Sequence, residues 1–284
     1  MKLKVTIVGL GLIGGSLGMA IRKKKLARVI GLTRDKSKAA LAVKMKAFDY
    51  ASTNIRGIIQ EADIIFICYP MHLIVPEIQR IIQFVKPGAI ITDVGSSKAV
   101  IVKEAERLMR KDVYFVGGHP MAGKEKAGLE NAESGLLEGA NYILTRTPKT
   151  NVKALNVLKG LISKIGAKVT VLDPAVHDSI VAGISHMPMA VAAALVDFVS
   201  GAGKLSDELA RFAASGFRDT TRIASGDPQL GTDMFTTNKK AVLDSLGAFK
   251  KSLSEIEKLI KEGDPAKIHE KLSNIRNFRD SMYE

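Results

Sequence analysis

The chain has 284 residues, of which 46% are hydrophobic, and this is enough for a proper core in one large domain or two smaller ones. Its formal net charge of +13 could attract anionic ligands, but the lysines are scattered and no nucleic-acid motif accompanies them, so we expect no nucleic acid as a partner. It has no apolar run of 18 residues, and the first predicted strand begins near Lys4, so we expect neither a membrane span nor a signal peptide.

A dinucleotide-binding motif opens the chain. The β-branched run of the predicted strand 4–9 leads into a glycine-rich turn, and a helix is predicted over 12–25. In a G-x-G-x-x-G turn the first glycine permits the bend, the second lets the backbone approach a pyrophosphate, and the third lets helix and strand pack closely. The helix N-terminus then offers N–H groups to the phosphates. The residues expected to contact the cofactor here are Gly9, Gly11, Leu12, Ile13 and Gly14.

The end of the second predicted strand, 28–33, bears on the choice of cofactor. NAD-binding versions of this fold carry an acidic residue there to bond the ribose 2′-hydroxyl. Here Thr33 occupies that position and Arg34 follows, a pair that could receive a 2′-phosphate. These residues favour NADP over NAD, although a shift of register would make Asp35 the ribose ligand.

Strands and helices continue to alternate up to residue 172. Further strands are predicted at 63–68, 89–94, 113–118, 141–146 and 168–172, and further helices near 36–46, 71–85, 98–110 and 151–164. This alternation predicts an α/β fold, a Rossmann-type doubly wound and mostly parallel sheet from which the last strands depart. The single cysteine, Cys68, lies in one apolar strand and cannot form an internal disulfide, which fits a cytoplasmic setting.

Three strand ends carry residues suited to a site, because ligands of such sheets bind at the carboxyl ends of strands. Ser96 follows the strand 89–94, and its alternative role is to cap the next helix. His119 stands between two glycines and a proline on a constrained loop. Tyr69 and Pro70 are expected to border the nicotinamide, whereas His72 beside them is set aside as a helix-capping residue.

The pattern becomes wholly helical after Asp173. We predict one dinucleotide-binding domain over 1–173 and an all-helical C-terminal substrate and dimerisation domain over 174–284. Its helices are expected at 174–200, with a bend at Pro188, and near 204–214, 228–260 and 265–281. Long apolar helices would expose much surface in a monomer, so a homodimer is favoured over a self-contained bundle.

Two histidines and two arginines are the chemical candidates in this half. His177 and His186 are nine residues apart, which in a regular helix puts them on opposite faces, and His186 is the one expected to face the cleft. Arg218 and Arg222 are four residues apart and could share a helical face. An arginine in a cleft suits a carboxylate, whereas a surface salt bridge is the alternative role for either arginine.

The motifs together resemble those of the prephenate/arogenate dehydrogenases of tyrosine biosynthesis. The resemblance runs, over essentially the whole chain, through Gly9 to Gly14, Asp93 to Lys98, Gly117 to Gly123, Ser185 to Pro188 and Gly216 to Arg222. It implies oxidative decarboxylation of a cyclohexadienyl substrate with NAD(P)⁺. By the resemblance, His119 is the catalytic base, Ser96 orients it and the nicotinamide, and Arg222 with His186 holds the substrate carboxylates; no metal is needed.

The same resemblance leaves the substrate's side chain open. Gly31 to Arg34 resembles the NADP-using arogenate branch, whereas Lys124, where relatives often carry a smaller polar residue, could favour the pyruvyl tail of prephenate. Two other functions remain as alternatives: an NADP-linked dehydrogenase of the 3-hydroxyacid type, and a nucleotide-sensing protein without catalysis. The former usually relies on a lysine base in its helical domain, and the His119 and Arg222 motifs count against both.

Overall fold

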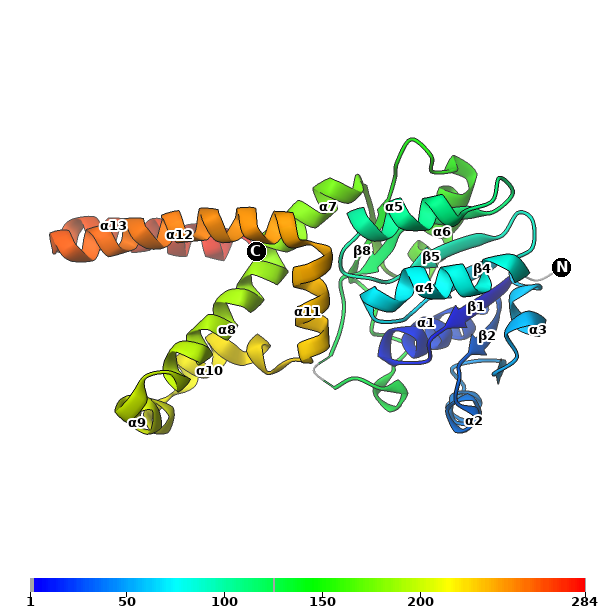
Figure 1. Ribbon diagram of the computed structural model, residues 1–284, viewed down its shortest axis with the longest axis horizontal. Helices are drawn as coiled ribbons and strands as arrows, with labels where there is room; N and C mark the ends of the chain where they lie inside the picture. The colour runs from blue at the N-terminus through cyan, green and yellow to red at the C-terminus, as the bar shows by residue number, and fades with distance from the viewer. Residues whose placement is uncertain (1–2, 125, 284) are drawn as a thin grey trace. The chain divides into compact units, whose positions relative to one another are not determined.

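The computed structural model describes residues 3–124 and 126–283 (Figure 1). It divides into two compact units, residues 1–239 and 240–284, and each is described by itself.

A six-stranded parallel sheet forms the centre of the first unit. Its strand order is β3-β2-β1-β4-β5-β6, the doubly wound order in which the chain starts in the middle and works outward to each edge. The strands are β1 (Lys4–Val8), β2 (Arg28–Leu32), β3 (Tyr50–Ser52), β4 (Ile64–Ile67), β5 (Ile90–Asp93) and β6 (Tyr114–Val116). The predicted α/β fold is confirmed, and β3, only three residues long, is a strand that the sequence did not reveal.

Helices cover both faces of the sheet because alternate side chains of each strand point to opposite sides. Val5 and Ile7 of β1 share a buried cluster with α1 and α6, whereas Val8 lies in a second cluster with α3, α4 and α5. The helices are α1 (Leu12–Lys23), α2 (Lys36–Lys44), α3 (Ile55–Ile59), α4 (Met71–Ile81), α5 (Ala99–Leu108) and α6 (Val152–Lys164).

The last strands form a separate small sheet in the order β7-β8-β9. β7 (Gly118–Pro120) pairs antiparallel with β8 (Asn141–Thr145), which pairs parallel with β9 (Lys168–Leu172). The departure from parallel order was expected, but β7 was not, since three residues with two turn formers give no strand pattern. His119 therefore belongs to the small sheet and not to the main one.

The helical part of the first unit begins with a 27-residue helical run. It comprises α7 (Pro174–Val181), a π-helical segment (Ala182–His186) and α8 (Met187–Ser200). After this run the chain forms α9 (Ser206–Phe212), α10 (Ser215–Thr221), a short 3₁₀ turn (Arg222–Ser225) and α11 (Pro228–Thr237). The predicted interruption therefore comes earlier than Pro188, as a widened turn that ends just before it.

The helical run 174–200 bears on the expectation that the chain has no membrane span. By length and composition alone this helix, among the residues described, is apolar enough to cross a membrane. The run contains two aspartates and two histidines, so it is not an unbroken apolar stretch, but these few polar residues do not remove a helix from this class. Yet His177, Asp178 and His186 of the run are buried within the chain.

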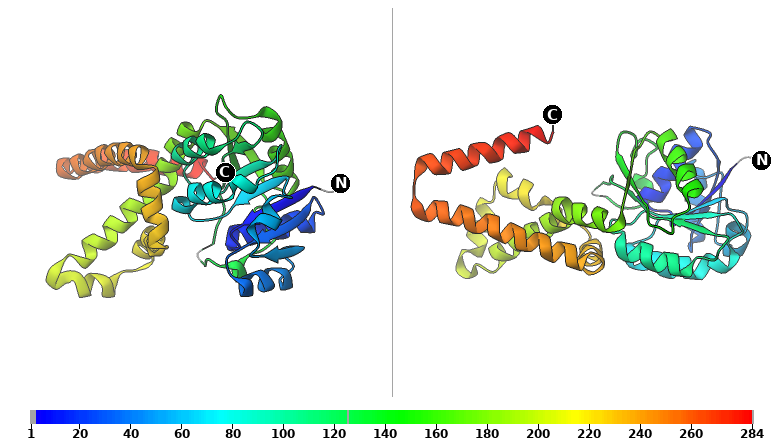
Figure 2. Two further views of the ribbon diagram at one scale, coloured as in Figure 1. Left: turned by 45° about the vertical axis from the view of Figure 1, so that its right-hand side comes forward. Right: turned by 90° about the horizontal axis from the view of Figure 1, so that it is seen from above.

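The second unit consists of a helical hairpin. α12 (Lys239–Glu262), with only its first residue in the first unit, is followed by α13 (Pro265–Ser281), which turns back alongside it, as the orange and red ribbons of Figure 2 show. Lys271 of α13 pairs with Glu255 of α12 across the hairpin. The single helix predicted for 228–260 is in fact two, α11 and α12, separated at Asn238.

Candidate active site

The glycine-rich turn between β1 and α1 has the form that a pyrophosphate requires. Gly9 adopts φ +99°, and a Cβ there or at Gly14 would overlap a backbone carbonyl. A Cβ on Gly11, by contrast, would meet nothing within 4 Å, so the backbone there faces open space. Gly11 also precedes the first residue of α1 and has no side chain to cap that helix, so the N–H groups of the first turn are available to an anion.

The three residues after β2 have distinct environments. Asp35 is the N-cap of α2, and its carboxylate accepts hydrogen bonds from the backbone N–H groups of Ser37 and Lys38. Thr33 is buried, whereas the Arg34 side chain is 69% exposed, 3.6 Å from the Glu77 carboxylate and 5.8 Å from the Tyr69 ring centre. Asp35 thus has a structural role already, and Arg34 is the exposed cation at this strand end.

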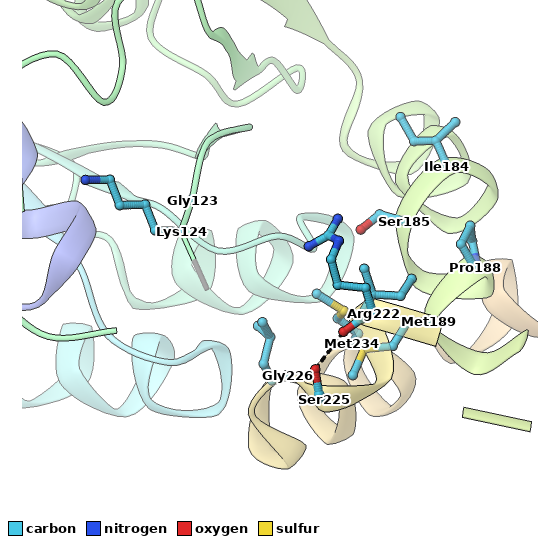
Figure 3. Close-up of a pocket in the computed structure, with 12 residues that line it drawn as sticks. Gly123, Lys124, Ile184, Ser185, Pro188, Met189, Arg222, Ser225, Gly226 and Met234 are labelled. Atoms are coloured by element: carbon cyan, nitrogen blue, oxygen red, sulfur yellow. Dashed lines mark hydrogen bonds between the residues drawn. The ribbon is translucent and has the colours of Figure 1, made fainter. Parts of the chain in front are cut away.

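Two cavities adjoin each other, and the first of them borders the glycine-rich turn between β1 and α1. The first, of about 620 Å³, is lined by Gly11, Leu12 and Ile13 from the turn, by Tyr69 and Pro70 after β4, by Ser96 after β5, and by His119. The second, of about 850 Å³, is lined by Lys124, Arg222 and residues of α8 and α11 (Figure 3). They share Gly123, Ser185, Leu230 and Met234, so the cavity beside the dinucleotide motif adjoins the cavity lined by Arg222.

His119 lies in this space with one ring nitrogen already engaged. Its Nδ1 is 2.8 Å from Nε2 of His177, and Nδ1 of His177 is 2.8 Å from Oδ1 of Asp178. Burial, together with the nearby charges of Lys98, His177 and His186, holds the pKa of His119 well below 6.5. The imidazole is therefore neutral at physiological pH, the form that can accept a proton.

An ion pair without solvent contact supports the strand that carries His119. The Lys98 ammonium bonds the Asp93 carboxylate and the carbonyl oxygen of Gly118, the latter at 2.9 Å. Asp93 also accepts the N–H of Gly118 at 3.1 Å. Because burial disfavours an ammonium, the pKa of Lys98 is lowered, although Asp93 acts in the opposite direction.

Ser96 lies where the sequence predicted, but its hydrogen bond goes elsewhere. Its hydroxyl donates to Sδ of Met71 at 3.2 Å, and the neighbouring Ser97 bonds Thr237 at 2.7 Å. The N-cap of α5 is Lys98, so Ser96 does not have the capping role that was its alternative. The partner of His119 Nδ1 is His177, not Ser96.

The structure separates the two arginines. Arg222 begins the 3₁₀ turn after α10 and lines the second cavity, and in Figure 3 its guanidinium lies near the Ser185 hydroxyl. Arg218 is 77% exposed and is 3.3 Å from Asp219, the surface pair that was its alternative role. Lys124 borders the same cavity, but its ammonium is 2.7 Å from Glu133 and points away from Arg222.

His186 requires a correction. The π-helical segment between the two histidines changes the helical phase, so the expectation that they lie on opposite faces is wrong. Both influence the charge of His119, and His186 Nδ1 is 3.2 Å from the Asn238 amide. Its Nε2 has no hydrogen-bond partner among the described residues, and burial lowers its pKa to about 4. Ser185, beside it, is the residue that lines the cavities.

The sequence alone did not identify several residues that surround His119, and His72 was set aside. His177 was discarded on helical spacing, and Asp178, Asp93 and Lys98 were not assigned roles. The adjacent His177-Asp178 pair at the start of a helix was the available signal. His72, set aside as a helix cap, bonds the Asp233 carboxylate at 2.8 Å and so joins α4 to α11. In the part of the chain that the structure describes, no cluster of three potential metal ligands occurs.

Comparison with known proteins gives consistent matches. A family model described as the prephenate dehydrogenase nucleotide-binding domain matches residues 17–171, and one described as its dimerization domain matches residues 173–274. The chain is 34% identical to prephenate dehydrogenase of Bacillus subtilis, covering 99% of this chain and 76% of that protein.

Two solved structures are similar over nearly their whole length. The Synechocystis arogenate dehydrogenase is 37% identical, with a TM-score of 0.87, over 99% of this chain and 100% of that one. The prephenate dehydrogenase of Aquifex aeolicus, solved with hydroxyphenyl propionate and NAD⁺, is 31% identical, with a TM-score of 0.93, over 99% of both chains.

Proposed function

The chain belongs to the prephenate/arogenate dehydrogenase family of NAD(P)-dependent oxidoreductases in tyrosine biosynthesis, and on that premise we propose how its own residues act. His119 is the general base, Arg222 binds a substrate carboxylate, NADP is the preferred cofactor and arogenate the preferred substrate. The observation that carries this proposal is the pair of adjoining cavities, one lined by Gly11 and His119 and the other by Arg222, which share four lining residues.

His119 removes the proton of the substrate's ring hydroxyl. Its Nδ1 is engaged by His177, so Nε2 is the nitrogen left for substrate, and its low pKa keeps it unprotonated. A bound oxidised nicotinamide would supply the acceptor for the hydride of the hydroxyl-bearing carbon. Loss of the ring carboxylate as CO₂ makes the ring aromatic, and His119 returns its proton to the phenolate oxygen.

Arg222 is suited to hold the carboxylate that leaves. A guanidinium gives two parallel hydrogen bonds to a carboxylate and keeps its charge at every working pH. Ser185 adds a hydroxyl on the same side of the cavity. His186 remains a predicted substrate residue, acting from behind Ser185, and Ser96 remains the predicted neighbour of the nicotinamide.

The cofactor preference rests on the end of β2. With Asp35 used as a helix cap, the 2′ position of a bound adenosine would meet Thr33 and Arg34. A hydroxyl and a guanidinium suit a 2′-phosphate, whereas a carboxylate would repel it. Gly9, Gly11 and Gly14 with the α1 N-terminus would hold the pyrophosphate, and Tyr69 and Pro70 would border the nicotinamide.

The substrate preference rests on Lys124. Its charge is balanced by Glu133 at 2.7 Å, so Lys124 brings no unpaired positive charge to this end of the cavity. A balanced lysine suits the zwitterionic tail of arogenate better than the single negative charge of a pyruvyl tail, which would favour an unpaired cation. The likeness to the Synechocystis arogenate dehydrogenase supports the same choice.

We further propose a cytoplasmic homodimer. The chain carries the family's dimerisation domain, and its helices leave large apolar side chains such as Phe198, Phe212 and Phe278 about 70% exposed. A second copy covers the apolar side of the run 174–200, whose buried histidines fix it to its own chain. Sedimentation should give about twice the chain mass of 30.6 kDa.

Steady-state rates with both substrates and both cofactors test this function. We expect the highest kcat/KM with arogenate and NADP. A higher kcat/KM with prephenate would contradict the proposed substrate, and a higher one with NAD would contradict the proposed cofactor. His119→Asn should lower kcat by about 10²–10⁴-fold and leave cofactor affinity unchanged. The wild-type kcat/KM should be level at neutral pH and fall only well below pH 6.5, because the lowered pKa of His119 delays its protonation.

A further inference from the structure

The Asp178 carboxylate is fixed at the start of another helix. Oδ1 accepts the backbone N–H of Lys98 at 2.6 Å, and Oδ2 accepts that of Ala99 at 2.8 Å. These two N–H groups belong to the N-terminus of α5, where the helix dipole favours a negative charge. Asp178 on α7 thus replaces the side-chain cap that α5 lacks in its own sequence, and it is bound as a carboxylate.

An ionised Asp178 determines which nitrogens carry protons along the chain of bonds. A carboxylate only accepts, so Nδ1 of His177 must carry the hydrogen of their 2.8 Å contact. In a neutral imidazole the other nitrogen is then an acceptor, so Nε2 of His177 receives a hydrogen bond from Nδ1–H of His119. His119 is left with its lone pair on Nε2, the nitrogen available to the cavity.

We propose that Asp178 and His177 are positioning residues for this reaction, which hold His119 in the tautomer whose Nε2 accepts the substrate proton. The inference rests on the proposed role of His119 as base. His177 is 1% exposed and Asp178 4%, so water does not compete for these bonds. The same pair also stabilises the imidazolium of His119 once it forms, because the Nδ1–H bond then becomes charge-assisted.

The groups that face His119 act in opposite directions. Burial, Lys98 at the start of α5, His186 in the π-helical segment and His177 when it is itself protonated all disfavour the protonated form of His119. Asp178 offers the nearest compensating carboxylate along α7, and Asp93 compensates Lys98 from β5. Without the relay, the ring would be both a weaker base and free to take the wrong tautomer, with Nε2 protonated.

His177→Phe is the direct test, since it keeps a ring of similar size and removes both nitrogens. We expect kcat to fall about 10- to 100-fold, with KM and NADP affinity within about threefold of the wild type, because the base and not the binding site is disturbed. The acidic limb of the pH profile should move to lower pH, because the His119 imidazolium loses its acceptor. His177→Gln, whose amide oxygen can accept the His119 Nδ1–H, should restore part of kcat.

Val176→Ala is the matched control. Val176 precedes His177 on α7, and its side chain is 50% exposed. This variant should keep kcat within twofold, which separates loss of the relay from a general disturbance of α7.

The tautomer can also be read without any variant at the relay. The chain has five histidines, so ¹⁵N spectra of the ring nitrogens can be assigned with single substitutions. We expect His119 in the wild-type protein to be protonated at Nδ1 and unprotonated at Nε2.

Three outcomes are decisive. A His119 protonated at Nε2 in the wild type overturns the relay. So does a His177→Phe enzyme with kcat within threefold of the wild type while His119→Asn is impaired. An active His119→Asn enzyme instead overturns the assignment of the base, and so identifies a failure of the proposed function.

Discussion

Lys98 and Asp93 form an ion pair with no solvent exposure, and both hydrogen-bond Gly118, the residue before the proposed base. Removing two charges from water is costly, and the cost is recovered only when both partners and their remaining hydrogen bonds are in place. The pair therefore ties the end of β5 to β7 and sets the position of His119.

Removal of one partner should be severe. Lys98→Met leaves the Asp93 charge buried and uncompensated, and we expect a loss of about 3–5 kcal/mol in the free energy of unfolding. The double variant Asp93→Asn, Lys98→Met should recover part of that loss, because no net charge then remains. Urea unfolding measures both; a Lys98→Met protein within about 1 kcal/mol of the wild type would contradict this role.

The cofactor preference can be altered at the end of β2. Thr33→Asp should repel a 2′-phosphate and move the preference toward NAD, because a carboxylate bonds the ribose hydroxyls. Arg34→Ala should lower kcat/KM for NADP about 10-fold or more and leave that for NAD nearly unchanged. Lys44→Ala, which removes an exposed cation from the far end of α2, is the control for net charge. Equal losses with both cofactors would exclude Arg34 from 2′-phosphate recognition.

Arg222 should contribute mainly to binding. Losing a charged hydrogen bond in a partly buried site costs about 2–4 kcal/mol, so Arg222→Ala should lower kcat/KM roughly 30- to 1,000-fold, chiefly through KM. Arg222→Lys should restore only part, since an ammonium lacks the planar fork. Arg218→Ala is the paired control, because its exposed side chain meets Asp219 outside the cavity. A greater loss for Arg218→Ala would show that the wrong arginine was assigned.

Acid should destabilise the fold through His186. Its pKa is about 4 in the folded state and about 6.5 when unfolded, so the unfolded chain binds more protons between these values. The free energy of unfolding should therefore fall as the pH is lowered from 6.5 to 4, by at most about 3 kcal/mol from this group. His186→Gln should weaken that dependence, and the exposed His269→Gln should not. If the free energy of unfolding depends on pH in the same way in the wild type, His186→Gln and His269→Gln, then His186 is not the group responsible.

Elements with strong local patterns were predictable from the sequence, and short or irregular ones were not. The apolar runs of β1, β4 and β5 lie in the centre of the sheet and need no further information to be recognised. β3 and β7 have three residues each, which is too short for a period of two to be visible. Their pairing comes from neighbours distant in the sequence.

Within the site, residue types were predictable but partnerships were not. His119 was found because glycines and a proline hold it on a constrained loop at a strand end. Its partner His177 was lost because a regular helix was assumed, and the π-helical segment invalidates that assumption. That Asp35 caps α2, which bears on the proposed choice between Arg34 and Asp35 as the ribose contact, is likewise a matter of backbone geometry that composition does not reveal.

The widened turn at Ala182–His186 also constrains which insertions and deletions this enzyme can tolerate. A π-helical turn is an α-helix with one extra residue, so deleting a single residue here, such as Gly183, could restore a regular helix with little loss of backbone hydrogen bonds. Every residue of α8 would then be rotated by about 100° relative to α7. Such a protein could fold and yet no longer present Ser185 and Met189 to the cavity that Arg222 lines, so this one surplus residue keeps α7 and α8 in phase for the site.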